Sequence, residues 1–393
     1  MNSAQPLYTT QFSLLCASYF FFAASFTMII PELPAYLSSL GGEDYKGLII
    51  FLFTFSAGFS RPFSGKLSDT IGRVPVMIVG TLVCVVCSAL YPVFTTVWGF
   101  LFLRLLHGFS TGFKPTASSA YVADIVPVDR RGEAMGMAGV SMNVGAMIAP
   151  AFGGYLAIYY GLDAMFYASS AMALFSIVIL LGLKETLAEK QPFHPKILVI
   201  NRHEIFEAAA IAPAILVALL YFSYGVLLTI TPDQSEALGI DNKGYFFLVF
   251  TIFSIISRLI AGRISDIYGR VIVIKVSGFF TGLSLLLLGY ADTVTSFFVA
   301  AGLSGFALGI SSPAVMAWTV DRAPDSRRGR AMATMYIALE AGIGIGALIS
   351  AWIFGNNLKN LPAVYWLTGG CAWMGVFYLQ FIFKDKKVLA QKL

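Results

Sequence analysis

The amino-acid sequence predicts an all-α membrane protein, with twelve transmembrane helices in two pseudo-symmetric six-helix bundles. Three observations support this prediction: an apolar composition, twelve long apolar runs and a charged loop that occurs twice. Of the 393 residues, 58% are apolar and only 12% are charged, whereas charged residues make up about a quarter of an ordinary soluble domain. This composition is typical of a polytopic membrane protein and not of a soluble globule. The net charge of +5 does not indicate a nucleic-acid partner.

The apolar runs set the number of predicted spans. A helix needs about 20 predominantly apolar residues to cross the hydrocarbon core of a bilayer. Twelve such helices are expected, at roughly residues 10–38, 47–64, 74–94, 97–122, 132–157, 164–183, 208–231, 245–261, 272–290, 295–319, 331–354 and 363–383. Several runs contain glycine, serine and threonine, which are frequent where helices pack closely in lipid.

The lysines and arginines predict the orientation of the chain. With both termini placed inside, the outer loops hold only Lys46, Lys243 and Lys359, and the inner segments hold most of the others. Positive charge concentrates on the cytoplasmic side of membrane proteins. We therefore expect a multi-pass protein of the plasma membrane (the inner membrane of a bacterium), with both termini in the cytoplasm and the lipid bilayer as its surroundings.

One polar connection divides the chain. Residues 184–207 are rich in Lys, Glu, Gln and Pro and separate the sixth apolar run from the seventh. We therefore predict an N-terminal six-helix bundle at residues 1–184, a cytoplasmic linker at 185–207 and a C-terminal six-helix bundle at 208–393.

An internal repeat relates the two predicted bundles. The stretch Gly65–Arg73, which reads GKLSDTIGR, recurs 197 positions later as Gly262–Arg270, which reads GRISDIYGR. The same shift superposes Arg61 on Arg258 and Asp124 on Asp321. Parallel repeats of six spans are one known plan of secondary transporters.

These features resemble the major facilitator superfamily over essentially the whole chain, in particular its twelve-span drug:proton antiporter branch. The loop between spans 2 and 3 matches the superfamily signature, and so does its copy between spans 8 and 9. The resemblance implies a cytoplasmic latch between the two bundles that breaks as the inner side opens. Its residues are Gly65, Asp69, Gly72, Arg73, Asp124 and Arg131, with Gly262, Asp266, Gly269, Arg270, Asp321 and Arg328 in the second copy.

The residue types of the loop have a physical reading. Gly72 and Gly269 permit a tight turn. Asp69 can accept hydrogen bonds from the unpaired amides of a helix N-terminus, and Arg73 can pair with Asp124. The alternative is that the loop is only a positive anchor that fixes topology.

Span 5 resembles the antiporter motif of the superfamily. It contains Gly136, Gly145, Pro150, Gly153 and Gly154, and Ala149 stands where the motif has glycine. The glycines allow close helix contact, and the proline removes one backbone hydrogen bond. The motif favours export by antiport, and generic packing of small residues is the alternative.

Span 4 carries four polar residues on one helical face: Arg104, His107, Thr111 and Lys114. Their spacing of i, i+3, i+7 and i+10 places them together, and charged groups inside a membrane should face a cavity or a partner. By resemblance Arg104 matches an arginine associated with proton coupling. We expect Lys114 to form a positive patch in the central cavity. A buried structural ion pair at Arg104 and a packing role for His107 are the alternatives.

Two carboxylates could carry the proton. Glu32 and Arg104 both lie about 10 Å outward of the membrane midplane at 1.5 Å per residue, so they could meet across spans 1 and 4, unless Glu32 sits in the outer mouth as a helix-end residue. Glu340 lies near the middle of span 11, with Asn143 as its repeat counterpart. Further candidates for the substrate cavity are Tyr221, Tyr224, Trp318 and Tyr336.

The sequence contains no nucleotide-binding loop, metal-ligand cluster or catalytic constellation. We therefore expect no enzyme activity and no cofactor, with a proton gradient as the energy source. The prediction is a monomeric secondary transporter that exchanges protons for small organic molecules, anionic or amphipathic compounds among them, in the direction of efflux. The alternatives are a proton-coupled importer of a sugar or organic acid and, more remotely, a membrane sensor without transport activity.

Overall fold

The computed structural model describes residues 9–127, 130–200, 206–324 and 327–383. The regular structure in these ranges is helical. The first half contains α1 (Thr10–Ile29), η1 (Ile30–Glu32), α2 (Leu33–Ser39), η2 (Glu43–Tyr45), α3 (Lys46–Ile71), α4 (Arg73–Leu90), α5 (Val97–Ile125), α6 (Arg131–Tyr160) and α7 (Leu162–Leu180). The second half contains η4 (Pro195–Leu198), η6 (Ala208–Ala210), α8 (Ile211–Ala237), α9 (Gly244–Tyr268), α10 (Arg270–Gly289), α11 (Val294–Arg322), α12 (Arg328–Phe354), η8 (Leu358–Asn360), α13 (Leu361–Phe377) and η9 (Tyr378–Ile382).

Each predicted span corresponds to a helix, so the predicted fold class is confirmed. The first span is divided, because Pro31 falls in the 3₁₀ segment η1 between α1 and α2. Ten of the described helices are long and apolar enough to cross a membrane. The two remaining spans are α13, an α-helix of only 17 residues, and α5, whose polar residues lower its mean hydropathy.

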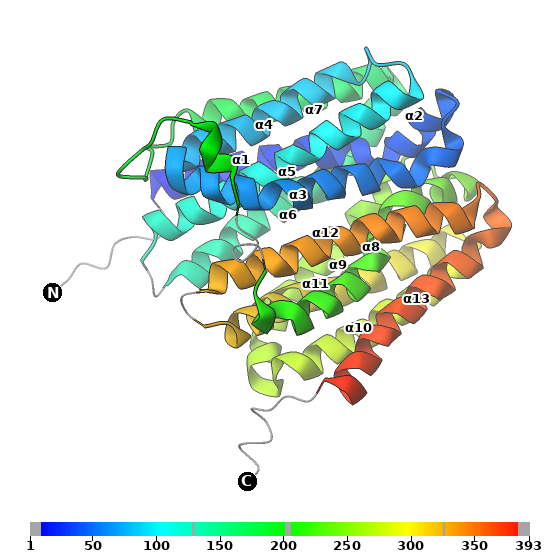
Figure 1. The fold of residues 1–393 in the computed structure, drawn as a ribbon. Coiled ribbons are helices and arrows are strands. Elements are labelled where there is room, and N and C mark those ends of the chain that lie inside the picture. The colour runs from blue at the N-terminus through cyan, green and yellow to red at the C-terminus, as the bar shows by residue number, and fades with distance from the viewer. Residues whose placement is uncertain (1–8, 128–129, 201–205, 325–326, 384–393) are drawn as a thin grey trace, which may run out of the picture.

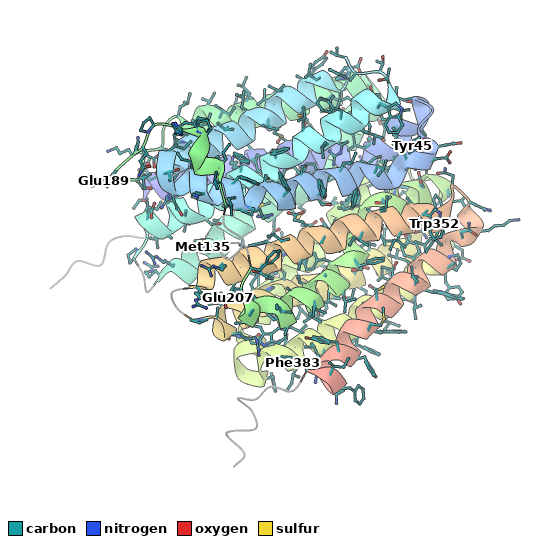
Figure 2. The ribbon with its side chains drawn as sticks, viewed as in Figure 1. Tyr45, Met135, Glu189, Glu207, Trp352 and Phe383 are labelled. Carbon is teal, nitrogen blue, oxygen red and sulfur yellow. The ribbon has the colours of Figure 1, made fainter. Side chains whose placement is uncertain are left out.

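The helices form two groups that lie against each other along their length. Helices α1–α7 make up one group and α8–α13 the other (Figure 1). The linker after α7 lies at the same end of the molecule as the start of α1 and the end of α13, and we call this end the terminal side. Figure 2 shows Glu189 and Phe383 toward this end, and Tyr45 and Trp352 at the opposite end, the far side.

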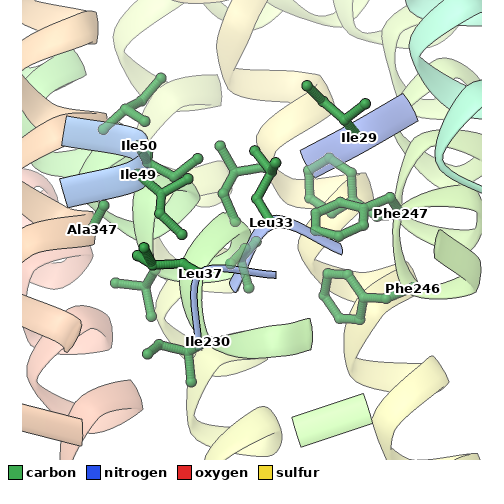
Figure 3. Packing of buried hydrophobic residues seen from close by; sticks show 14 of the residues in the cluster. Ile29, Leu33, Leu37, Ile49, Ile50, Ile230, Phe246, Phe247 and Ala347 are labelled. Carbon is green, nitrogen blue, oxygen red and sulfur yellow. The ribbon is translucent and has the colours of Figure 1, made fainter. Parts of the chain in front are cut away.

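Among the described buried residues, the apolar cluster that joins the two groups lies on the far side. One cluster there includes Leu33 of α2, Ile49 of α3, Phe246 of α9 and Ala347 of α12, which pack together (Figure 3). Toward the terminal side the described buried residues fall into separate clusters, one formed by α1, α3–α7 and one by α8 and α10–α13. The far side is therefore sealed by side chains of both bundles.

Two pseudo-equivalent helix pairs connect the bundles: α3 with α12, and α6 with α9. A Cβ on Gly47 would lie 2.9 Å from the carbonyl oxygen of Ala347, and a Cβ on Gly244 would lie 2.2 Å from that of Pro150. The two contacts are 197 positions apart on both partners, so the repeat in sequence is also a repeat in packing.

The signature loop is shorter than expected from the sequence. Helix α3 continues through Gly65 and Asp69 to Ile71, and the chain turns at Gly72 alone, with φ 125°. The second copy turns at Gly269, with φ 87°. The segment between Gly65 and Gly72 contains no helix-breaking residue, which explains why the helix persists beyond the apolar run.

Candidate functional site

An ion pair joins the two bundles inside the membrane. The guanidinium of Arg61 on α3 donates a hydrogen bond of 2.6 Å to the Glu340 carboxylate on α12, and it lies 4.8 Å from the centre of the Tyr336 ring. The two charged side chains are only 12% and 10% exposed. Gly58 of α3 faces Glu340, and a Cβ there would lie in van der Waals contact with the Cβ of Glu340, 3.4 Å away.

Arg258 on α9 is the repeat equivalent of Arg61. Its side chain is half-buried, and it interacts electrostatically with Tyr224 and Tyr336. Its Nε is buried without a hydrogen-bond partner. Tyr336 thus lies within the influence of both arginines, one from each bundle.

Arg104 and Glu32 do not meet, so the predicted pairing between them is wrong. Arg104 is 1% exposed and donates to the carbonyl oxygen of Ile49 at 2.9 Å and to the hydroxyl of Tyr91 at 3.3 Å. Its guanidinium stacks 4.5 Å from the centre of the Phe53 ring. The alternative of a buried ion pair at Arg104 is not observed either.

The remaining span 4 residues also lie within the N-terminal bundle. His107 is fully buried between the Tyr91 hydroxyl and the Cys84 thiol, each 3.1 Å away. Thr111 donates to the carbonyl oxygen of Gly108 in its own helix. The four residues lie on one helix, α5, but Arg104 and His107 contact residues of α3, of α4 and of the α4 end and do not face the other bundle.

Lys114 is enclosed between α1, α5 and α7. It is 0% exposed and donates to the carbonyl and hydroxyl oxygens of Ser18, at 2.9 and 2.8 Å, and to the Ser176 hydroxyl. The Phe22 ring lies 4.6 Å from its ammonium group. The expected positive patch in the central cavity is therefore absent at Lys114.

Glu32 belongs to an outer gate on the far side, as the alternative interpretation of this residue expected. The Lys243 ammonium lies 3.7 Å from Glu32 and 2.9 Å from Glu236, and Lys46 pairs with Asp233 at 2.8 Å. Each of the pairs Lys243–Glu32 and Lys46–Asp233 joins the two bundles. Two cavities of about 320 and 460 Å³ open beside Lys46, away from the ion pair in the membrane.

Helix α6, which carries the antiporter motif, packs closely against neighbouring segments in its far-side half. A Cβ on Gly145 would lie 2.3 Å from the carbonyl oxygen of Phe20, one on Gly153 2.3 Å from that of Met28, and one on Gly154 2.2 Å from Oδ1 of Asn242. A Cβ on Gly136 would meet nothing within 4 Å. The motif thus holds α6 against α1 and against the start of α9, where Pro150 also lies.

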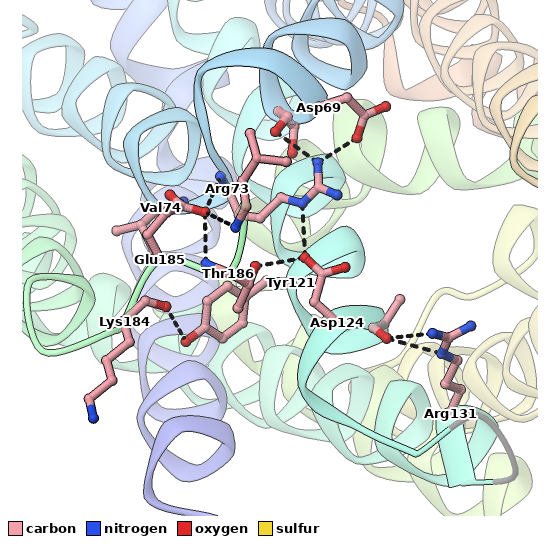
Figure 4. A network of polar contacts seen from close by, with 12 residues as sticks. Asp69, Arg73, Val74, Tyr121, Asp124, Arg131, Lys184, Glu185 and Thr186 are labelled. Carbon is pink, nitrogen blue, oxygen red and sulfur yellow. Dashed lines mark hydrogen bonds and ion pairs between the residues drawn. The ribbon is translucent and has the colours of Figure 1, made fainter. Parts of the chain in front are cut away.

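The first latch loop binds the linker and not the second bundle. Arg73 donates to Asp124 at 3.1 Å and to Asp69 at 2.5 Å, and Asp124 also accepts a hydrogen bond from Thr186 at 2.6 Å (Figure 4). Arg131 donates to the carbonyl oxygen of Ala123. The hydrogen bonds and ion pairs observed for this cluster stay within the first bundle and the linker.

Glu185 performs the role that the sequence suggested for Asp69. Its carboxylate accepts hydrogen bonds from the backbone N–H groups of Arg73 and Val74, at 3.0 and 3.1 Å, at the N-terminus of α4 (Figure 4). A Cβ on Gly72 would lie 2.4 Å from its Oε2. Burial alone would raise the pKa of Glu185, but N–H donors from Leu187, Arg73, Val74 and Thr186 outweigh it, and the pKa is lowered.

The second loop copy is described only in part. Arg270 donates to Asp321 at 3.3 Å and to the Ser265 hydroxyl at 3.0 Å. The side chains of Asp266 and Arg328, and the surroundings of Gly262, lie outside the described part of the structure. The repeat position of Glu185 is Ile382, so an equivalent carboxylate cap cannot form there.

Of the predicted cavity walls, the tyrosines come together. Tyr221 and Tyr224 make an edge-to-face contact at 6.3 Å, and Tyr336 is in electrostatic contact with Tyr221. Trp318 instead is 3% exposed and packs 5.2 Å from Phe383 on the terminal side. Asn143 lies half-buried on α6.

Sequence reasoning missed the partner of Glu340. From the sequence, Arg61 was considered as the repeat counterpart of Arg258 and not as a partner of Glu340. The internal repeat could have indicated this partner. Arg61 and Arg258 occupy equivalent positions within apolar runs, and a basic residue in such a position is expected to have a partner inside the membrane.

Comparison with known families shows to which family the chain belongs. The sequence profile of the Major Facilitator Superfamily matches residues 15–240 and 213–392. The chain belongs to the Major Facilitator Superfamily. Among solved structures of this superfamily fold, the D-xylose-proton symporter superposes with a TM-score of 0.79 at 15% identity, over 95% of this chain and 97% of that one. The human organic anion transporter MFSD10 (TETRAN) gives 0.74 at 18% identity, over 94% and 99%.

Two bacterial relatives within the superfamily are similar over most of their length. The multi-drug resistance efflux pump PmrA homolog of Lactococcus lactis subsp. lactis (strain IL1403) is 27% identical over 86% of each chain. The multidrug resistance protein MdtG of Proteus mirabilis (strain HI4320) is 27% identical over 91% of this chain and 92% of its own.

Proposed function

We propose that this superfamily member exports small organic molecules in exchange for protons, by alternating access of its two bundles. The names of the bacterial relatives support efflux of drugs. The packing of the antiporter-motif helix against α1 and α9 supports the same direction. We infer that the protein needs no cofactor, performs no chemical conversion and works as a monomer.

The observation that carries the proposal is the ion pair between Arg61 and Glu340. A carboxylate inside the membrane is costly unless it is paired. While Glu340 is ionised, its attraction to Arg61 holds α12 against α3. When a proton neutralises Glu340, that attraction is lost, and the two bundles can rearrange around the midplane. Proton binding and bundle motion are thereby coupled through one contact.

The described conformation fits one stage of this cycle. The far side is sealed by a shared apolar cluster and by the outer gate, whereas the terminal side has separate clusters. Since basic residues concentrate on the terminal side, we propose that this side is cytoplasmic and that the protein resides in the inner membrane of a bacterium. The conformation then faces inward.

The test is transport by purified protein in liposomes under an imposed pH gradient. With the cytoplasmic side facing outward and the lumen acidic, ethidium or 2-naphthalenesulfonate should accumulate in the lumen as protons leave it. Glu340→Gln should abolish accumulation driven by the gradient and leave counterflow of the probe intact. Probe movement in the same direction as the protons would contradict exchange and favour an importer.

A further inference from the structure

Arg258 is a cation in the membrane interior, and none of the described residues provides an anion for it. Its side chain is half-buried, and it makes no hydrogen bond or ion pair with any described residue. Its neighbours Ile256 and Leu259 are 50% and 72% exposed and cover the lipid-facing side of α9. Arg258 instead lies near Tyr224 and Tyr336, which belong to α8 and α12.

The internal repeat shows what is missing around Arg258. Its equivalent Arg61 has a carboxylate, Glu340, and an aromatic ring, Tyr336, both from α12. The same positions on α6 are occupied by Asn143 and Gly139. A Cβ on Gly139 would meet nothing within 4 Å, so the space directly beside Gly139 is open. The second helix pair therefore repeats the cation and lacks its partners.

The other intramembrane cations considered above, Arg61, Arg104 and Lys114, all donate hydrogen bonds, although Nη2 of Arg104 is buried without a partner. Arg61 is neutralised by Glu340. Arg104 and Lys114 are enclosed in the first bundle, where carbonyl and hydroxyl oxygens accept their hydrogen bonds. Burying a charge without a partner in a membrane is costly. Arg258 is half-buried and its Nε has no hydrogen-bond partner, so an anion that comes from outside the protein would stabilise it.

We infer that Arg258 binds an anionic group of the transported molecule, namely a carboxylate, sulfonate or phosphate. This group would lie beside Asn143 and Gly139, the positions at which the second helix pair lacks the carboxylate and the aromatic ring of the first. A guanidinium binds such oxyanions through two parallel hydrogen bonds. Tyr224 and Tyr336 would contact the apolar body of the same molecule. The inference deepens the proposed function and rests on it in assigning the bound anion to the cargo.

The experiment measures binding of three matched probes to the purified full-length protein. The probes are 2-naphthalenesulfonate, neutral 2-naphthalenesulfonamide and the cation 2-naphthyltrimethylammonium, which share one ring system. The parent protein should prefer the sulfonate to the sulfonamide. Arg258→Gln should weaken sulfonate binding at least tenfold and leave sulfonamide binding unchanged, as expected for a charge-assisted hydrogen bond.

Two further variants control this result. Arg258→Lys keeps the charge but cannot form the two parallel hydrogen bonds, so its sulfonate preference should lie between that of the parent and that of Arg258→Gln. Lys359→Gln removes one positive charge from an exposed far-side position and should change nothing. Without ligand, Arg258→Gln should unfold at a higher temperature than the parent, because it removes an unpaired charge from the membrane interior.

The outcomes separate the anion site from the transport direction. Equal binding of sulfonate and sulfonamide by the parent, or equal losses of both in Arg258→Gln, would overturn the anion site. Sulfonate binding that depends on Arg258 and tightens on acidification through Glu340 would support the site. It would also indicate that anion and proton move in the same direction. That result would contradict the proposed proton exchange but not the anion site.

Discussion

Arg61 and Glu340 neutralise each other across the boundary between the two bundles, 2.6 Å apart and almost excluded from solvent. Neither residue has a second charged partner among the described ion pairs. The pair therefore links the charge state of one carboxylate to the contact between α3 and α12.

Removing one member of this pair should destabilise the protein more than removing both. Arg61→Gln leaves Glu340 unpaired and buried, which typically costs about 3–5 kcal/mol. The double variant Arg61→Gln/Glu340→Gln removes both charges and should recover most of the loss. Thermal unfolding in detergent at pH 8, where a lone carboxylate tends to ionise, measures the difference. A double variant as unstable as the single one would show that the pair does not act as a unit.

Lys114 should be dispensable for charge recognition. In Lys114→Met the hydroxyl of Ser176 can still bond to Ser18, as it does in the parent at 2.9 Å, and methionine fills a similar volume. We expect stability within about 1 kcal/mol of the parent and an unchanged ratio of sulfonate to sulfonamide binding. A ratio that falls in Lys114→Met would place the anion in the first bundle, against the assignment to Arg258.

Two glycines of the antiporter-motif helix should respond in opposite ways to the same substitution. Gly145→Ala drives a Cβ to 2.3 Å from the backbone of Phe20, and overpacking of this kind costs about 1–3 kcal/mol. Gly136→Ala enters open space and should stabilise the helix by up to about 1 kcal/mol. Thermal unfolding of both variants provides the test, with each serving as the control of the other.

Glu185 should make the linker contact sensitive to acid. Because its pKa is lowered in the folded protein, its stabilisation is fully present above the ordinary glutamate pKa of about 4.3. The stabilisation is lost as the pH falls through the lower, folded value. Hydrogen exchange of the amides of Arg73 and Val74 should therefore accelerate, relative to intrinsic rates, between about pH 5 and pH 3. In Glu185→Gln these amides should exchange faster at neutral pH, and the additional acceleration in acid should disappear.

The sequence predicted the helices well because their signals are local. Length and hydropathy define a span without reference to its neighbours, and the repeated loop showed that spans 2 and 3 are equivalent to spans 8 and 9. The interruption at Pro31 and the extension of α3 to Ile71 were not predicted. Pro31 lies within the first apolar run, and Ile71 lies beyond the end of the second.

The candidate site was predicted only in part, because partners depend on packing between distant segments. Helical spacing showed that Arg104 and Lys114 share a face, but it could not show which neighbours that face meets. Depth in the membrane brought Glu32 and Arg104 to one level, yet Lys243 reaches Glu32 from the other bundle. Glu340 was recognised as an intramembrane carboxylate, and its partner emerged only with the packing of α3 on α12.

The linker contacts have a practical consequence for dividing the chain. Besides the Glu185 cap, the Gln191 N–H donates to the carbonyl oxygen of Thr70, and the Lys66 ammonium to that of Val199. If the protein is expressed as two fragments, the chain should therefore be divided after Val199. The first fragment then keeps the linker residues that bind to its own helices α3 and α4. A cut at residue 184 would leave the start of α4 uncapped, and that fragment would be the more vulnerable to proteolysis.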